Sequence, residues 1–342
     1  MADERIRNME DFASVSGISR PTLSRFFHDP QSVRKATRAR IEQALEKFDY
    51  QPNIFAINQN RKLSKTIGIL VPFLTDPFFA EIVRQIERSC IDAGYWPIVF
   101  SAHGETELEN NALATLRSLK PAGALIAPLG RTSKLHTVER FTRDVPTVVI
   151  DSNMPVGKAF VGSDNHQSIT LIVDYLCRTG EPPCFFEMPP VNPNAGKRRD
   201  AYISAMQNLG HKPLVISATT ESRWQFEQIG LETGLELISR RAVPSSTVLC
   251  SNDRIAMGLI TAAYQKGMRV GRGEDCALRI AGHDDHPFAR FTCPPLTTVR
   301  QNYDAIATKS VNVLFNLING DEPSRGRLEH LHESTLVTRA SA

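Results

Sequence analysis

The sequence lacks the features of secreted, metal-binding and membrane proteins. Its six cysteines stand far apart and form no Cys-x-x-Cys pair, so neither a zinc site nor a disulfide framework is indicated. No apolar run reaches the length of a membrane span or of a signal-peptide core, and the first residues are charged. We therefore expect a cytoplasmic protein with no membrane partner, no metal and no cofactor.

The motifs of common enzymes are missing as well. The chain has no Gly-x-Ser-x-Gly elbow, and the glycines of residues 267–273 fit neither dinucleotide nor phosphate-loop spacing. Two pairs of histidines, in residues 283–286 and 330–332, come without a third metal ligand, so we interpret them as turn or edge-strand residues. We expect no catalytic residue. The alternative is an enzyme of doubly wound fold, which predicts turnover of a bound sugar or nucleotide.

What the chain does contain is a basic N-terminal segment. Of its 342 residues, 41% are hydrophobic and 23% are charged, which is ordinary for a globular protein large enough for two or three domains. Residues 1–65 hold 12 Lys and Arg against 8 Asp and Glu, whereas the other 277 residues hold 28 and 29. This asymmetry is typical of a small module that contacts phosphate groups.

Residues 8–28 have the pattern of two short helices joined by a glycine turn. Asn8 can cap the first helix, Ser16-Gly17 ends it, and Ser19 is expected to cap the second. The apolar positions are Met9, Phe12, Ala13 and Val15 in the first helix and Leu23, Phe26 and Phe27 in the second. This pattern fits a helix-turn-helix, whose second helix enters the major groove of DNA, and equally a helical hairpin with a solvated face.

Residues 34–50 are predicted to form a third amphipathic helix. Its inward positions are Ile41, Ala44, Leu45 and Phe48. Arg34, Lys35, Arg38 and Arg40 crowd its start. Positive charge there opposes the helix dipole, so these residues indicate a negatively charged partner.

Five motifs in this region carry a family resemblance. They are Asp11-Phe12-Ala13, Gly17-Ile18-Ser19, Thr22-Leu23-Ser24-Arg25, Thr37-Arg38 and Asp49-Tyr50-Gln51-Pro52-Asn53. In order and spacing they resemble the headpiece of the lactose-repressor (LacI) family of bacterial transcription regulators. The resemblance implies that Arg20, Pro21 and Arg25 read bases in the major groove, while Thr22 and Ser24 contact phosphates.

The segment after the headpiece, residues 53–65, is predicted to be a linker. In the resembled family this linker forms a hinge helix on DNA, and a leucine is wedged into the minor groove. Asn53 and Ala56 match family positions, but Gln59 stands where the leucine is expected. The resemblance implies DNA contact from all three residues. Glutamine separates base steps poorly, so DNA kinking by this chain is left open.

From residue 66 onward, buried strands alternate with amphipathic helices, as parallel α/β sheets require. The alternation forms two similar blocks, which predict two lobes with a cleft between them. The predicted strands are 67–71, 96–100, 124–127, 147–150, 184–188, 213–216, 247–250 and 277–281, and the predicted helices are 79–93, 108–119, 132–143, 167–178, 196–209, 225–240 and 254–266. With the resemblance, the fold class is an all-α helix-turn-helix headpiece plus an α/β two-lobed, periplasmic-binding-protein-like effector domain with two parallel sheets flanked by helices.

The expected domains are the headpiece, residues 1–52, the linker, 53–65, and an effector-binding and dimerisation domain, 66–342. The resemblance implies that the chain crosses between the lobes three times. Lobe 1 would comprise about 66–160 and 292–322, and lobe 2 about 161–291 and 323–340. The resemblance also implies a homodimer formed through the effector lobes, and since no heptad tail follows Arg339, we expect a dimer rather than a tetramer.

Polar and aromatic side chains recur where the predicted strands end. Loops at the carboxyl ends of parallel strands bind ligands in open α/β sheets, and carboxylates beside aromatic rings suit a polyol. The family resemblance continues here in residues 76–82, 251–258, 282–285 and 294–301. The strand ends and the resemblance together predict these effector-binding residues: Asp76, Phe78, Phe79, Asp151, Arg198, Trp224, Asn252, Asp284 and Gln301, with Phe226 as the alternative to Trp224.

A neutral sugar or polyol is the favoured effector. Arg198, with Lys197 and Arg199 beside it, could admit a sugar acid or a phosphate, and a purine or nucleoside could stack on Phe78 or Phe79. We expect a sequence-specific transcriptional repressor that binds double-stranded operator DNA under the control of a small-molecule effector. The alternatives are a regulator that needs its effector as co-repressor and a sugar-binding protein without a DNA function.

Overall fold

The structure is a computed structural model that describes residues 6–52, 64–217, 224–321 and 326–342. The chain divides into two compact units, residues 1–65 and residues 66–342. Each unit has its own apolar core.

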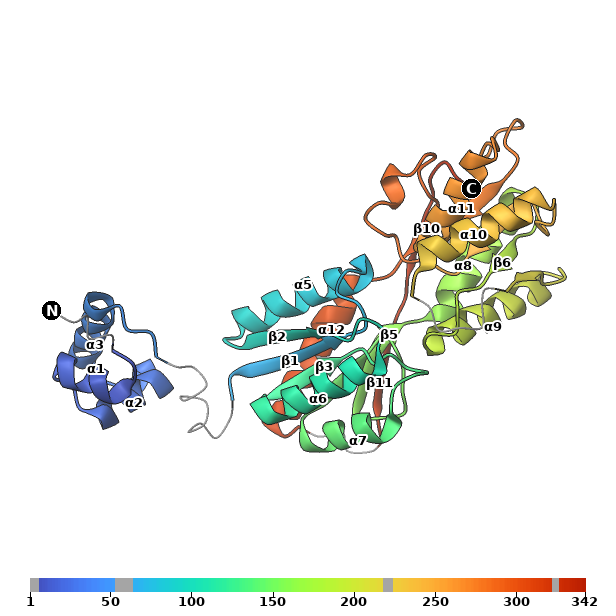
Figure 1. The fold of residues 1–342 in the computed structure, drawn as a ribbon. Helices are drawn as coiled ribbons and strands as arrows, with labels where there is room; N and C mark the ends of the chain where they lie inside the picture. The colour runs from blue at the N-terminus through green and yellow to red at the C-terminus, as the bar shows by residue number, and fades with distance from the viewer. Residues whose placement is uncertain (1–5, 53–63, 218–223, 322–325) are drawn as a thin grey trace. The chain divides into compact units, whose positions relative to one another are not determined.

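In the first unit, described over residues 6–52 and 64–65, the chain forms short helices and a 3-10 turn (Figure 1). They are α1 (Met9–Ser16), α2 (Arg20–His28), η1 (Pro30–Ser32) and α3 (Lys35–Phe48). The Asn8 side chain accepts a hydrogen bond of 2.9 Å from the Asp11 amide and so caps α1. Gly17 ends α1 in the left-handed conformation, with φ of 64°, which costs glycine little. The two short helices and the turn between them therefore form as the sequence predicts.

The core of this unit is built from one face of each helix. Phe12, Leu23 and Ile41 are fully buried, and the Phe12 ring stacks on Tyr50 with 4.5 Å between ring centroids. Two expectations differ in detail. Val15 is 45% exposed because it lies beyond the edge of the apolar face of α1, which has Phe12 at its centre. The Ser19 hydroxyl contacts the Thr22 hydroxyl at 2.8 Å rather than capping a backbone amide.

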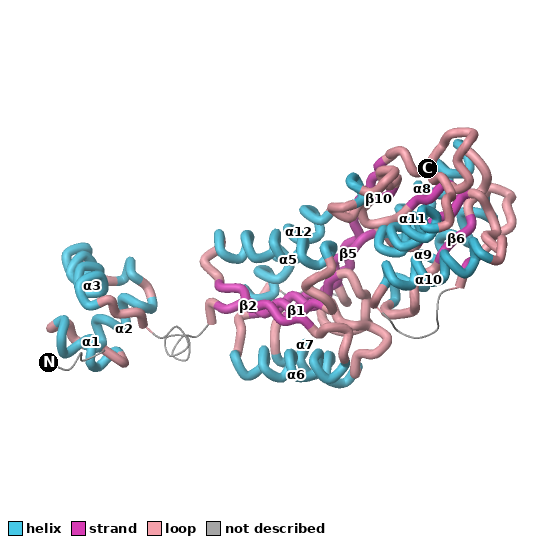
Figure 2. Tube along the Cα trace, turned by 45° about the horizontal axis from the view of Figure 1, so that its top comes forward, coloured by secondary structure: helices cyan, strands magenta, loops and turns pink. Residues whose placement is uncertain are grey.

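The second unit begins with a six-stranded parallel sheet in the order β11-β5-β4-β3-β1-β2. Helices α5 and α12 cover one face of this sheet, and α6 and α7 cover the other, as Figure 2 shows. The strands are β1 (Thr66–Val71), β2 (Trp96–Ser101), β3 (Gly123–Ile126), β4 (Thr147–Ile150), β5 (Ala159–Ser163) and β11 (Leu328–His332), and the helices are α5 (Pro77–Asp92), α6 (Thr106–Leu119), α7 (Leu135–Asp144) and α12 (Tyr303–Asn319). We call this layered body the first lobe.

The second lobe is built on a four-stranded parallel sheet in the order β7-β6-β8-β9. Helices α8 and α9 pack together, and α10 packs on α11, which contacts β8 and β9. The strands are β6 (Cys184–Phe186), β7 (Val215–Ile216), β8 (Thr247–Cys250) and β9 (Arg279–Ala281), and the helices are α8 (Asn165–Thr179), α9 (Pro193–Asn208), α10 (Phe226–Ser239) and α11 (Asp253–Gln265). An antiparallel pair, β10 (Thr298–Arg300) with β12 (Thr335–Val337), completes the unit. In the described part of the chain, no helix is long and apolar enough to cross a membrane.

The chain crosses between the lobes later than we predicted at all three places. We assigned residues 323–340 to lobe 2, but β11 pairs with β5 in the first sheet as far as His332. We assigned residues 292–322 to lobe 1, but bridges join Thr297 to Ala281 and Arg300 to Asp284, so the chain stays with the second lobe through Arg300. The first crossing is later by a few residues, because β5 continues the first sheet to Ser163. The limits of the two lobes are set by backbone hydrogen bonds between strands, which the amino-acid composition does not reveal.

The core of the first unit gives a direct test of its packing. Leu23→Ala removes a fully buried side chain and should lower the free energy of unfolding of this unit by about 2–5 kcal/mol. Val15→Ala, a change at an exposed position of α1, is the matched control. Hydrogen exchange of the α1 to α3 amides in the full chain measures both, and equal protection in the two variants would contradict the packing described here.

Candidate functional site

The exposed face of α2 carries the residues predicted to touch DNA. Arg20, Pro21, Ser24 and Arg25 are exposed, while Thr22 is half-buried. Arg20 forms an ion pair of 3.2 Å with Glu10 of α1, and both side chains are largely exposed. Such a pair contributes little to stability and leaves the guanidinium free to exchange partners. The face therefore offers two guanidinium groups and two hydroxyls to a nucleic acid. The other predicted contacts, Asn53, Ala56 and Gln59, lie outside the described residues.

All nine residues predicted to bind an effector line one pocket of the second unit, with a volume of about 410 Å³ including its open part. The first lobe supplies Asp76, Phe78, Phe79 and Asp151; the second supplies Arg198, Trp224, Asn252 and Asp284; Gln301 follows the crossing strand β10. The pocket also includes six residues that the sequence analysis did not select as its first choice: Met188, Val191, Asn192, Asn194, Phe226 and Arg254.

Two pocket residues are also helix caps. The Asp76 carboxylate accepts a 3.0 Å hydrogen bond from the Phe78 amide at the start of α5. The Asn252 side chain likewise accepts a 2.9 Å bond from the Ile255 amide at the start of α11. Strand-to-helix loops at the carboxyl ends of a parallel sheet need such caps. Asp76 and Asn252 can therefore cap helices and also bind an effector.

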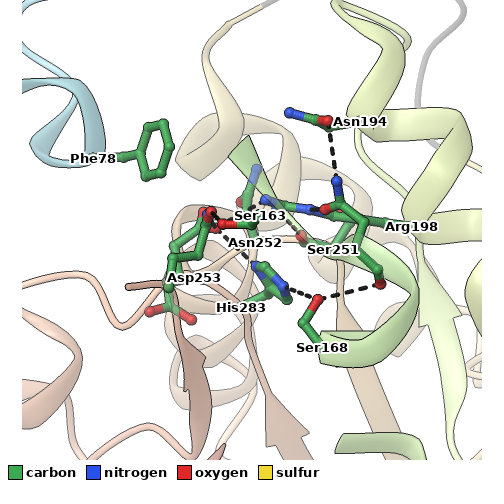
Figure 3. A network of polar contacts seen from close by, with 12 residues as sticks. Phe78, Ser163, Ser168, Asn194, Arg198, Ser251, Asn252, Asp253 and His283 are labelled. Carbon is green, nitrogen blue, oxygen red and sulfur yellow. Dashed lines mark hydrogen bonds and ion pairs between the residues drawn. The ribbon is translucent and has the colours of Figure 1, made fainter. Parts of the chain in front are cut away.

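The centre of the pocket wall is the ion pair of Arg198 and Asp284, at 3.1 Å. Arg198 is 4% exposed and also donates to Asn165 Oδ1 at 2.9 Å and to the Ser251 carbonyl at 2.7 Å. Asp284 Oδ1 accepts from Gln301 Nε2 at 2.6 Å and lies 2.8 Å from His283 Nδ1. Figure 3 shows Arg198 and His283 in this network, with Phe78 nearby. A buried ion pair is tolerated when its remaining donors are satisfied in this way.

The titration of this network follows from burial and charge. Burial raises the pKa of Asp284, but Arg198 and His283 outweigh it, so the pKa lies below its ordinary value. Burial and the nearby Arg198 lower the pKa of His283 to about 4. At neutral pH Asp284 is thus an ionised carboxylate, and His283 beside it is a neutral imidazole. Asp284 has φ of 118°, a conformation that costs a non-glycine residue free energy and is typical of functional sites.

Asp151 holds the facing side of the pocket on the first lobe. Its Oδ1 accepts a 2.9 Å hydrogen bond from Asn194 Nδ2, and the same nitrogen donates to the Asp151 carbonyl at 3.2 Å. Burial raises the pKa of Asp151 to about 7, with Arg198 opposing the rise and Asp284 adding to it. Asn194 therefore joins the second lobe to the first, although no pattern in the sequence distinguishes it.

Aromatic rings line the rest of the pocket. Phe78 packs edge-on against Phe79 and Tyr303, at centroid distances of 4.9 and 5.6 Å. The ring centroids of Trp224 and Phe226 lie 5.8 Å apart, and both residues line the pocket. The two alternatives for this effector-binding residue are therefore not exclusive. Rings of this kind can cover the C–H face of a sugar or stack on a base.

Arg254 is one of the pocket residues that sequence reasoning missed. It stands at the second position of α11, where a charged side chain is ordinarily read as solvated. In the structure it forms ion pairs with Asp76 of the first lobe at 2.9 Å and with Glu227 at 2.7 Å. Its proximity to Asn252 in the sequence is the signal that could have identified it.

The histidine pairs do not form a metal site. His283 is buried in the network above, and His330 and His332 belong to β11, the edge strand of the first sheet. Within the described ranges, no group of three or more His, Cys, Asp or Glu side chains could hold a metal ion.

Comparisons with known proteins agree with this architecture. Residues 163–342, more than half of the chain, match the family of periplasmic binding protein-like domains, and residues 8–53 match the bacterial regulatory proteins of the lacI family. The ribose operon repressor of Escherichia coli K12 is 28% identical over 330 residues, covering 94% of this chain and 96% of that protein. The repressor PurR of Pasteurella multocida is 27% identical over 350 residues, covering 97% and 98%. A crystal structure of the lac repressor dimer bound to operator and the anti-inducer ONPF superposes with a TM-score of 0.82 at 23% identity, covering 98% of each chain.

A helix-turn-helix unit joined to a two-lobed α/β unit with a polar pocket between its lobes defines a DNA-binding transcription regulator that responds to small molecules. The chain belongs to the LacI family of these bacterial regulators. The predicted fold class and family are thereby confirmed. Contact of individual residues with DNA or with an effector stays a prediction.

The raised pKa of Asp151 leads to a test by pH. The pKa is about 7 in the folded chain against an ordinary 3.8, so the folded state binds more protons than the unfolded state between these values. The free energy of unfolding that Asp151 contributes is therefore present below about pH 4 and is lost as pH rises through about 7. Asp151→Asn keeps the acceptor for Asn194 and tolerates the φ of 57°.

We expect the stability of Asp151→Asn relative to the wild type to increase by about 1–3 kcal/mol between about pH 4 and pH 8. Urea denaturation of both proteins across this range measures the difference. Asp304→Asn, a change at an exposed position of α12, is the matched control. Parallel stability curves for Asp151→Asn and the wild type would show that Asp151 does not titrate as described.

Proposed function

We propose that the chain is a repressor that binds operator DNA as a homodimer and changes its operator affinity when a neutral sugar occupies the pocket. The assignment of a sugar rests on the way in which the charged side chains of the pocket are paired with one another. Three carboxylates, Asp76, Asp151 and Asp284, line it together with two arginines. Arg198 is already paired with Asp284, and Arg254 with Asp76 and Glu227.

An anionic effector fits this arrangement poorly. Its charge would have to displace a carboxylate from a guanidinium in a partly buried site, next to further carboxylates. The neighbouring cations do not help, since Arg199 pairs with Glu187 at 3.6 Å and Lys197 lies 5.8 Å from the Phe160 ring centroid. Sugar hydroxyls donate to carboxylates without adding charge. These observations favour a sugar or polyol over a sugar acid or a phosphate.

A nucleoside is the second candidate. Phe78, Trp224 and Phe226 all line the pocket and offer ring faces or edges to a flat base. Two of the relatives, the ribose operon repressor and PurR, point by name to different effectors, so likeness alone does not separate a sugar from a purine derivative. The sugar is favoured because the pocket has more carboxylates than a nucleobase can engage.

The homodimer has support from exposed aromatic side chains in the second lobe. Tyr264 of α11 is 81% exposed. Phe288, which precedes η2 (Ala289–Phe291), is 62% exposed, and Phe291, its last residue, is 74% exposed. Large exposed apolar side chains mark an association surface where they form one contiguous patch. We place them in the dimer interface, which leaves two headpieces for a roughly palindromic operator in the cytoplasm.

The effector acts through linkage. A ligand that binds the closed lobes more tightly than the open lobes shifts their equilibrium, and the shift changes operator affinity through the dimer. A coupling free energy of about 1–3 kcal/mol is usual for such systems, and operator DNA must change effector affinity by the same factor. We propose that the chain binds its effector without converting it, so the ligand is recovered unchanged.

The first experiment is binding of the purified protein to labelled DNA from upstream of its own gene, against a scrambled duplex and at two salt concentrations. A panel of D-ribose, D-xylose, D-glucose, gluconate, inosine and adenosine is then screened for release or tightening of the complex. Preference for the native fragment, with affinity that falls steeply with salt, is the expected result. Response to gluconate alone would contradict the neutral-sugar assignment, and chemical change of a panel compound would contradict simple binding.

Arg25→Ala tests the recognition helix. If Arg25 reads a base edge, the variant should lose about 1–3 kcal/mol of operator affinity and relax preference at one position of the site. Arg178→Ala, at an exposed arginine of the second lobe, is the matched control and should bind as the wild type does. A uniform loss across all DNA sequences would instead identify Arg25 as a phosphate contact.

Asp284→Asn tests the pocket. The neutral side chain tolerates the backbone conformation of Asp284 but leaves Arg198 without its counterion. We expect the response to the panel sugar to be lost while operator affinity changes by less than about threefold, because Asp284 belongs to the second unit and the DNA-reading residues to the first. Operator release by the same sugar at wild-type concentrations would remove Asp284 from the effector site.

A further inference from the structure

Arg254 connects the two lobes at the pocket. It lies on α11 of the second lobe, and its Nη1 donates across the pocket to Asp76 Oδ2 of the first lobe at 2.9 Å. The side chains of Arg254 and Asp76 are only 18% and 10% exposed. A charge-assisted hydrogen bond is stronger when water is largely excluded, so this contact resists separation of the lobes.

The guanidinium is held in place by its own lobe. Nε and Nη2 donate to the two carboxylate oxygens of Glu227, each at 2.7 Å, and Nη2 also donates to the Trp224 carbonyl at 3.2 Å. The guanidinium lies 5.0 Å from the Phe226 ring centroid. These partners precede or belong to α10, so Arg254 keeps its position whether or not Asp76 is present.

An aromatic contact lies beside the ion pair. Trp224 is 7% exposed and packs on Phe73 of the first lobe, with 5.3 Å between ring centroids. A Cβ atom at Gly104, also in the first lobe, would lie 2.9 Å from Trp224 Cδ1, so the indole touches the backbone there. Trp224 and Arg254 thus reach the first lobe together. We call Asp76, Phe73, Trp224, Glu227 and Arg254 the interlobe clasp.

We propose that Arg254 is a specificity-determining residue of the effector pocket, which holds the lobes closed through Asp76 when no effector is bound. An effector that enters must replace the Arg254 to Asp76 bond. A hydroxyl group can do so, because it accepts from Nη1 and donates to the Asp76 carboxylate at once. An apolar group, or a group that only accepts, leaves the Asp76 carboxylate without a donor.

The chemistry of Arg254 supports this exchange. A guanidinium has five N–H donors, and four of them are used by Asp76, Glu227 and Trp224. Among the described residues the structure gives no acceptor for the fifth, which belongs to Nη1. Arg254 can therefore hold Asp76 and meet the first oxygen of an arriving ligand before the lobes separate. The inference deepens the proposed function by selecting ligands with hydroxyl groups at this end of the pocket.

The test measures exposure of Trp224 without effector or DNA, so that its outcome is independent of the proposed function. The chain has two tryptophans, and Trp96 is 58% exposed, so Trp96→Phe leaves Trp224 as the only reporter. Acrylamide quenching then reports how far the clasp is open. Asp76→Asn is the main variant, because asparagine still caps α5 while the ion pair is lost.

We expect Asp76→Asn to raise the quenching constant at least about twofold, since loss of a hydrogen bond to a charged group shifts an equilibrium by about tenfold. Asp92→Asn, a change at an exposed position of the same helix, is the matched control and should leave quenching unchanged. Arg254→Gln combined with Asp76→Asn should add little to either single variant, because both remove the same bond.

Unchanged quenching in a folded Asp76→Asn protein, checked by circular dichroism, would overturn the proposal, as would full additivity of the two substitutions. If Asp76→Asn does not fold, Arg254→Lys decides the question. Lysine keeps the charge but cannot contact Glu227 and Asp76 through one planar group. A rise in quenching for Arg254→Lys supports the clasp, and wild-type quenching refutes it.

Discussion

The ion pair of the buried Arg198 and the half-buried Asp284 is the constraint on which the pocket depends. It joins α9 to the loop after β9, and through Gln301 it reaches Ser163 at the end of the first sheet. Charges buried to this degree need both a partner and further hydrogen bonds, and here the Asn165 side chain and the Ser251 carbonyl supply them. The network therefore fixes the position of Arg198 before any ligand arrives.

The backbone of Asp284 is part of the same constraint. Its φ of 118° is maintained because its amide donates to the Val299 carbonyl at 2.8 Å and its carbonyl accepts from the Tyr303 hydroxyl. Strain of this kind persists only where the surroundings over-determine the conformation. The carboxylate is thus held at the point where the chain passes from the second lobe to the first, so a change at Asp284 is felt by both lobes.

Much of the fold and the pocket could be predicted from the sequence. Apolar periodicity located the headpiece helices and the strands β1–β4 and β6–β9, although it missed β5, β10, β11, β12 and helix α12. All nine residues predicted to touch an effector line one pocket. Asp76 and Asn252 were identifiable because they follow strands and cap helices. The lobe limits were not, because the pairing of β11 with β5 joins segments whose composition is similar to that of their neighbours.

Partners across the pocket were also beyond sequence reasoning. Arg254 and Asp76 are 178 residues apart, and Asn194 and Asp151 are 43 apart. Local periodicity places each of these residues on a helix or in a loop but carries no information on which two will meet. A charged residue in the first turn of a helix is ordinarily solvated, so only the folded arrangement of two lobes distinguishes Arg254 from the many arginines that face water.

The pairing of charges within the pocket also bears on how binding could be converted into a conformational signal. A ligand shifts an equilibrium only by its difference in affinity for the two states. Asp76 with Arg254 and Asp151 with Asn194 already join the lobes, so a ligand that merely bridges them gains little over the empty pocket. The signal must come from ligand contacts that replace these bonds with a different spacing between the lobes. The size and hydroxyl pattern of the effector, rather than its charge, would then determine the direction of the response.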